Sequence, residues 1–131
     1  MRVIVTDTIG DLVSDLAAIP PKAAKDMMGC VRDGARAGNE IAKTSAKRTA
    51  GKHGKHYHRA FTSDVRRPFF GFGAAVYSAE YGPDAAKRQG GMSFERGSRN
   101  QPPHLDLAKS ADVIGPIFAR EVRKLPDGWF W

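Results

Sequence analysis

Three histidines in the segment 43–59 are the first residues whose chemistry has to be considered. His53, His56 and His58 carry imidazole nitrogens, which bind zinc and other transition metals. Their spacing matches no closed zinc pattern, and the single cysteine, Cys30, lies far away in the sequence. Lysines and arginines flank the histidines and repel a cation. We therefore expect no metal site, and no other cofactor.

Two glutamates, Glu80 and Glu95, are candidates for an acid–base pair of the kind that hydrolases use. Nothing in the sequence fixes the distance between them, and exposed glutamates beside turns are common. The serines have no base partner and no G-x-S-x-G turn, and no glycine-rich stretch leads into a phosphate-binding Lys-Ser/Thr pair. The sequence accordingly predicts no catalytic residue, and we expect a binding or assembly protein rather than an enzyme.

Positive charge is concentrated in one third of the chain. Residues 41–75 hold eight lysines and arginines against one acid, whereas the segments before and after are nearly neutral. Tyr57 and Phe61 interleave with these charges, as in many nucleic-acid-binding surfaces. Without a base-reading motif, contact with DNA would involve phosphates alone. A solvated basic face explains the charge equally well. Candidate contacts with DNA or an acidic partner are Lys43, Lys47, Arg48, Lys52, Lys55 and Arg59.

Length and composition predict one domain spanning residues 1–131. Because Cys30 is the only cysteine, an internal disulfide is excluded, which fits a reducing compartment. We find no signal peptide and no apolar run of about 20 residues, the length needed to span a bilayer. We therefore expect folding in a cytoplasm, without a membrane partner.

The helical half of the chain comes first. Residues Arg2–Thr6 predict an edge strand or an extended lead-in, and Thr8–Ala18 predicts a first helix that ends at Pro20-Pro21. A longer helix starts at Pro21, with apolar residues at helical spacing up to Ala46. Glycines at 51 and 54 end it.

The second half predicts strands and a closing helix. Phe61–Val65 and Phe69–Tyr77 have the composition of strands, and Met92–Glu95 predicts a third. An apolar pattern then predicts a helix over Leu105–Leu125. The order indicates an α+β fold, in which a small antiparallel sheet is packed by a long N-terminal helix and a C-terminal helix.

Two further segments invite a functional interpretation. The loop Gly82–Pro103 contains the densest turn chemistry of the chain, and such loops often carry function. The tail 126–131 ends in Trp129, Phe130 and Trp131, which either fold back onto the core or anchor in a neighbouring subunit. We favour the neighbouring subunit, because Gly128 loosens the tail from the helix.

Several short motifs, in order, give the chain a likeness to a known family. The motifs are Ile19-Pro20, the basic helix end Lys43–Arg48, Glu80–Asp84, Gln89–Gly91 and Phe94–His104, followed by the helix from Leu105. With these motifs the chain resembles the neck or tail-completion proteins of long-tailed bacteriophages, a family of head–tail joining, minor tail proteins. Arg96 departs from the family pattern, which has an aromatic residue at this place.

The resemblance implies a structural virion protein of the phage head–tail connector, assembled in the cytoplasm of the host bacterium. It would form or support a homo-oligomeric ring, with sixfold symmetry favoured, between the head-closure (adaptor) and tail-terminator proteins and around the passing genomic DNA. Subunit contacts are then expected at Glu80, Tyr81, Phe94, Glu95, Arg96, Pro102, Pro103, Trp129, Phe130 and Trp131. The alternative is a stand-alone, non-specific DNA-binding protein that uses the basic segment 43–67. A hydrolase that uses Glu80 or Glu95 is the third and weakest hypothesis.

Overall fold

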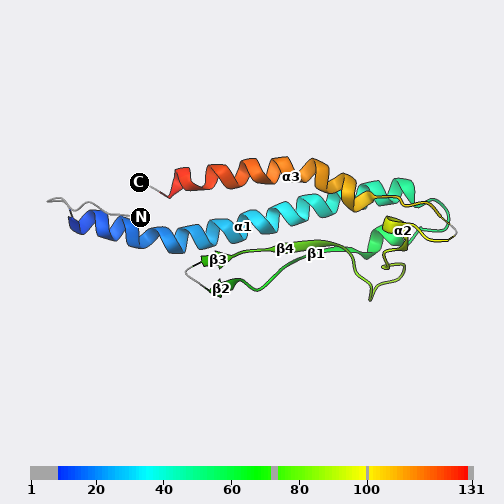
Figure 1. The fold of residues 1–131 in the computed structure, drawn as a ribbon, viewed down its shortest axis with the longest axis horizontal. Helices are drawn as coiled ribbons and strands as arrows, with labels where there is room; N and C mark the ends of the chain where they lie inside the picture. The colour runs from blue at the N-terminus through cyan, green and yellow to red at the C-terminus, as the bar shows by residue number, and fades with distance from the viewer. Residues whose placement is uncertain (1–8, 72–73, 100, 130–131) are drawn as a thin grey trace.

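Two long antiparallel helices form one layer of an elongated molecule, and β-strands form a second layer (Figure 1). The structure, a computed structural model, describes residues 9–71, 74–99 and 101–129. Helix α1 (Ile9–Thr49) runs along most of the length, and α3 (Asp106–Lys124) packs back along it. The predicted α+β class is confirmed. Across the described ranges, every helix is too short or too polar for a bilayer-spanning segment.

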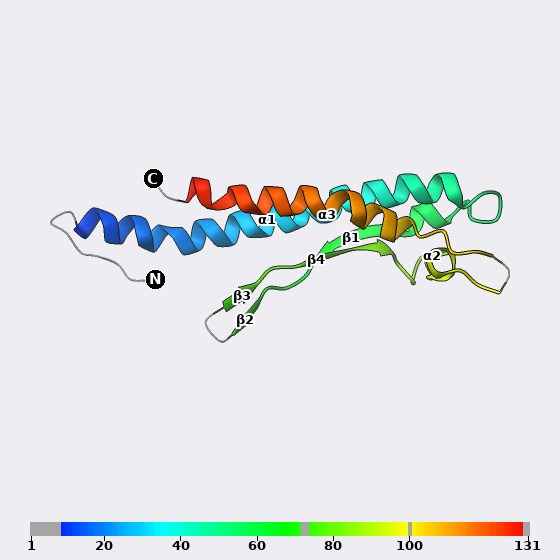
Figure 2. The same cartoon turned by 45° about the horizontal axis from the view of Figure 1, so that its top comes forward.

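The strands belong to one long, twice-paired hairpin. Strand β1 (Phe61–Val65) pairs antiparallel with β4 (Ala79–Pro83), and both contact α1. Between them, β2 (Phe69–Gly71) and β3 (Ala74–Val76) form a separate antiparallel pair. Figure 2 shows that β2 and β3 diverge from the helix layer, whereas β1 and β4 stay beside it.

The core lies where α1 ends and α3 begins. Three short elements complete the described fold: η1 (Tyr57–Ala60), α2 (Ser93–Arg96) and η2 (Leu125–Gly128). The Tyr57 ring is fully buried, stacks on Phe94 with ring centroids 4.5 Å apart and meets Phe61 edge-on at 5.0 Å. Small side chains at the end of α1 and directly after it let the backbone lie close to these rings; they are Ala42 and Ala46 on α1, and Ala50 after it.

Glycines on α1 let two aromatic rings approach its backbone. A Cβ atom added at Gly38 would lie 2.6 Å from the Tyr81 ring, and one at Gly34 would lie 2.8 Å from Phe118. Both distances are shorter than a real Cβ contact, so glycine is required at these places. Each glycine weakens the helix by up to about 1 kcal/mol, but these two allow a ring of β4 and a ring of α3 to pack against the α1 backbone.

Two buried carboxylates hold the start of α3 in place at the core. Asp106 is fully buried and accepts hydrogen bonds from the hydroxyls of Ser45 (2.7 Å) and Thr49 (3.0 and 3.1 Å) on α1. Glu95 accepts from the backbone N–H groups of Leu107 (2.8 Å) and Ala108 (3.1 Å). A carboxylate at these N–H groups satisfies donors that a helix start leaves free. The start of α3 is thus fixed from two sides.

The predicted helix boundary at Pro20-Pro21 is wrong. Helix α1 continues through both prolines as a single element. A proline ring holds φ near its helical value, so an internal proline removes hydrogen bonds of the preceding turn without forcing the chain out of helical geometry. The predicted end near Gly51 is confirmed, because α1 stops at Thr49. The expected lead-in Arg2–Thr6 lies outside the described residues.

The strand predictions have mixed outcomes. Phe61–Val65 is confirmed as β1, and the closing helix is confirmed as Asp106–Lys124. The predicted strand Phe69–Tyr77 is wrong, because the chain folds back on itself after Gly71, so that Phe69 pairs with Val76. The predicted strand Met92–Glu95 is also wrong, since residues 93–96 form α2 and thereby point Phe94 into the core.

The first residues of the predicted loop Gly82–Pro103 belong to β4 rather than to a turn. Pro83 is tolerated there because it is the last residue of its strand, opposite Phe61. Gly82 has a φ of 147°, a conformation that favours glycine. The loop proper therefore starts at Asp84.

Candidate assembly surfaces and a basic end

The end of the molecule where α1 stops carries a cluster of cations, here named the basic end. It comprises Lys43, Lys47, Lys55, Arg59 and Arg88. The pKa of His58 is lowered by burial and then by Lys47, Arg59 and Lys43. These three cations come from α1 and η1, yet they lie close enough together to act on one imidazole. The structure thus gathers three of the six predicted basic contacts around His58.

His56 extends the cluster and adds a residue that the sequence did not predict. Its pKa is lowered by burial and then by Arg88, Arg59, Lys55 and His58. Arg88 comes from the loop after β4, some thirty residues further along the chain. Gln89 ties this loop to the turn after α1, because its side chain accepts from the N–H of His56 (2.7 Å) and donates to the carbonyl of His53 (2.6 Å).

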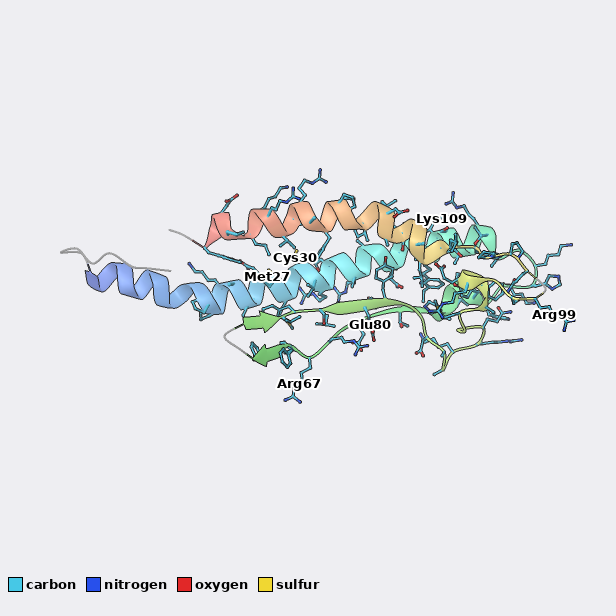
Figure 3. All side chains as sticks on the ribbon, in the orientation of Figure 1. Met27, Cys30, Arg67, Glu80, Arg99 and Lys109 are labelled. Carbon is cyan, nitrogen blue, oxygen red and sulfur yellow. The ribbon has the colours of Figure 1, made fainter. Side chains whose placement is uncertain are left out.

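The remaining predicted cations, Arg48 and Lys52, are exposed at the same end of α1 and in the turn after it. The figure of side chains places Arg99 at this far end of the molecule as well (Figure 3). Within residues 9–71, 74–99 and 101–129, no three His, Cys, Asp or Glu side chains are arranged to hold a metal ion. An anion is therefore the ligand that this surface attracts best.

Glu80 and Glu95 do not form a shared acid–base site. The Glu80 carboxylate is exposed on β4 and forms an ion pair with Arg66 at 2.5 Å. Glu95 is buried in α2, where both of its oxygens accept from α3. Each carboxylate already has a structural partner on a different element.

The predicted subunit-contact residues divide into two groups. Phe94 and Glu95 are buried inside the chain, and Tyr81 is half-buried with its hydroxyl hydrogen-bonded to Ser110 (2.8 Å). The exposed members are Glu80, Arg96, Pro102 and Pro103. Among the predicted contacts at residues 80–103, this second group is the one that lies exposed.

The aromatic tail begins by folding back onto its own chain. The indole N–H of Trp129 donates to Asp26 on α1 at 2.9 Å, and its side chain is half-buried. This contact ties η2 to the middle of α1. Phe130 and Trp131 lie outside the described residues.

Sequence reasoning missed the exposed apolar end of the hairpin, here named the hairpin tip. It consists of Phe69, Phe70 and Val76, which are 59%, 68% and 53% exposed. A strand-like run of aromatic residues is usually half-buried, so the composition of this stretch does not predict side chains that face solvent. The available signal was the position of Phe69 and Phe70 between two arginines and two glycines.

A groove of about 700 Å³ between α1 and α3 was also missed, here named the helix groove. Its apolar lining is Met28, Cys30, Ile114, Ile117, Phe118 and Leu125. Asp33 and Glu121 lie at its edge, and burial followed by these two acids raises the pKa of the Cys30 thiol. Figure 3 shows Cys30 on the side of α1 that faces α3.

Comparison of the chain with protein-family models, with curated protein sequences and with solved structures gives no match. The surfaces themselves therefore carry the functional argument.

Proposed function

We propose that the chain is a structural protein of a phage head–tail connector. In this proposal it forms or supports a ring between the head-closure and tail-terminator proteins, and DNA passes through the ring. The motif order from Glu80 to His104, which resembles phage neck proteins, motivates the proposal. The physical support comes from the hairpin tip and the basic end.

The hairpin tip is the single observation that carries the proposal. Two phenylalanines and a valine stand in solvent on a hairpin that diverges from the helices (Figure 2). Burying one such side chain contributes about 1.5–3 kcal/mol. A clustered apolar end of this kind is typical of a surface that a partner covers. This supports an assembly role more than a catalytic one.

The basic end supports a place beside DNA. Cations that already act on His56 and His58 also attract phosphates, without any reading of sequence. A passage for genomic DNA needs this kind of contact and no more. In a ring, several copies would repeat the basic end around the lumen.

Deletion of the gene from its phage tests the proposal. We expect full heads and free tails in the lysate, and joined particles when the wild-type chain is supplied from a plasmid. Normal particles from the deletion strain, or a block before DNA packaging, would contradict the neck role.

A second candidate function is that of a stand-alone, non-specific DNA-binding protein. The basic end favours it, because its five cations come from separated parts of the sequence and still lie together. If all five contact phosphates, the logarithm of affinity falls with the logarithm of salt concentration with a slope of about −4.5. Tight, salt-dependent binding of duplex DNA by the isolated chain would favour this function. Weak binding at physiological salt would favour the connector.

A further inference from the structure

We propose that the hairpin tip of one copy docks into the helix groove of a neighbouring copy. The inference rests on the proposed ring assembly and names the contact that would build the ring. The occupant of the groove is thus a second copy of this chain, and the site that receives it is formed by α1 and α3.

The hairpin tip has the form of an insert. Phe69 and Val76 lie directly opposite each other on paired strands, so their side chains share one face. Phe70, the next residue, points to the other face, where its ring meets Tyr77 edge-on at 6.3 Å. Because apolar side chains project from both faces, covering the tip requires a groove rather than a flat surface.

The helix groove offers space and an apolar lining for such an insert. At about 700 Å³ it falls within the range of pockets that hold sizeable ligands. Its lining includes Met28 and Cys30 of α1 and Ile114, Ile117 and Phe118 of α3. No strand residue lines it.

The charges beside the hairpin tip and at the groove edge favour this pairing. Arg67 is exposed beside the hairpin tip and projects away from the helices (Figure 3). The groove edge carries Asp33 and Glu121, and these acids raise the pKa of Cys30 after burial does. Two cations, Lys25 and Arg32, also lie there, and Arg32 pairs with Asp33 at 3.5 Å. Asp26 also lines the groove, so three acids outnumber these two cations and a net negative charge faces Arg67.

The two surfaces differ and are formed by different layers. An interface between unlike surfaces is heterologous, so each copy keeps one free surface after the first contact. Repetition of that contact gives a closed ring when the rotation closes. This geometry separates the proposal from a symmetric dimer, in which both surfaces would be used at once.

Two variants block one surface each. Phe69→Ser with Phe70→Ser removes the insert, and both residues are exposed, so the fold should survive. Gly29→Phe fills the groove, because a Cβ atom at Gly29 lies 3.7 Å from its nearest neighbour and meets no clash. Val113→Ser is the matched control, since Val113 is an exposed apolar residue of α3 that does not line the groove.

Light scattering of the full-length chain gives the test. We expect the wild type and the Val113→Ser variant to form the same oligomer, and each blocked variant to lose at least tenfold in association and remain monomeric. A mixture of the two blocked variants should form a 1:1 dimer and nothing larger, because one intact tip meets one intact groove. Circular dichroism should report the same folded state for all of them.

Three outcomes would overturn the proposal: a wild type that stays monomeric at every concentration, a blocked variant that assembles like the wild type, or a mixture that fails to dimerise. The failure of this contact is distinguishable from failure of the connector role. Blocked variants that still restore joined particles would remove the contact and leave the role intact. A ring in solution whose gene is dispensable for head–tail joining would remove the role and leave the contact intact.

Discussion

The two ends of this molecule use aromatic residues in opposite ways. At the end where α1 stops, Tyr57, Phe61 and Phe94 are buried against one another and against small residues of α1. At the hairpin end, Phe69 and Phe70 stand in solvent. The first end completes its own fold, and the second leaves apolar surface exposed. The comparison indicates where stability resides and where assembly would occur, and mutations can separate the two.

Matched phenylalanine truncations give the largest expected contrast. Phe94→Ala removes a ring stacked on Tyr57, and we expect a loss of about 3–5 kcal/mol in the free energy of unfolding. Phe70→Ala removes an exposed ring, and we expect a change within about 0.5 kcal/mol. Urea denaturation of dilute protein measures both. Similar losses for the two variants would remove the distinction between the ends.

Loss of the buried carboxylate at the start of α3 is expected to lower the free energy of unfolding nearly as much as loss of the Phe94 ring. Asp106→Ala leaves the hydroxyls of Ser45 and Thr49 without their acceptor, at a cost of about 3 kcal/mol. Asp112→Ala is the control, because Asp112 is exposed on the same helix and should cost less than about 0.5 kcal/mol. Equal values for the two aspartates would show that the hydrogen bonds to α1 contribute nothing.

Alanine substitution at two glycines of α1 should change the free energy of unfolding in opposite directions. Gly38→Ala drives a methyl group into the Tyr81 ring, and we expect destabilisation by about 1–3 kcal/mol. In Gly29→Ala the new methyl group makes only an ordinary van der Waals contact, 3.7 Å from the Arg32 side chain, and the better helix propensity of alanine should stabilise the fold by about 0.5–1 kcal/mol. Thermal unfolding of both variants checks the signs. Stabilisation by both would mean that Tyr81 does not pack on Gly38.

The smallest expected effect is the pH response of the basic end. Both His56 and His58 have folded-state pKa values below their ordinary value of 6.5. The unfolded chain therefore takes up protons first, so their contribution to stability is complete above pH 6.5 and declines as the pH falls through the window below it.

The same two histidines should couple DNA binding to pH. A bound phosphate favours the charged imidazole, so affinity for duplex DNA should rise severalfold from about pH 7.5 to about pH 5.5. A His56→Gln, His58→Gln variant should lose this dependence, as measured by fluorescence anisotropy at fixed salt. An unchanged pH dependence in the variant would place phosphate contact elsewhere.

Local patterns predicted the elements that local chemistry determines. The composition of Phe61–Val65 and the apolar spacing after Leu105 were sufficient for β1 and α3. Glycine ended α1 as expected, whereas the two prolines did not interrupt it. The single strand predicted over Phe69–Tyr77 was wrong because a three-residue hairpin arm and a continuous strand share the same composition.

The candidate surfaces depended on contacts that the sequence could not supply. Arg88 joins the basic end only because Gln89 bonds to backbone groups at residues 53 and 56. Asp106 finds its hydroxyl partners 57 and 61 residues earlier in the chain. The exposure of Phe70 depends on how the hairpin diverges from the helices. Each of these three features results from packing between distant parts of the chain, and no local sequence pattern predicts it.

Electron cryomicroscopy of intact particles tests the central claim most directly. If the proposed connector role holds, we expect phage particles to contain a ring between the head-closure and tail-terminator proteins into which the two helices and the hairpin fit. The hairpin tip should contact the next copy, and the basic end should face the DNA. A complete neck reconstruction in which every ring is accounted for by other proteins would contradict the account.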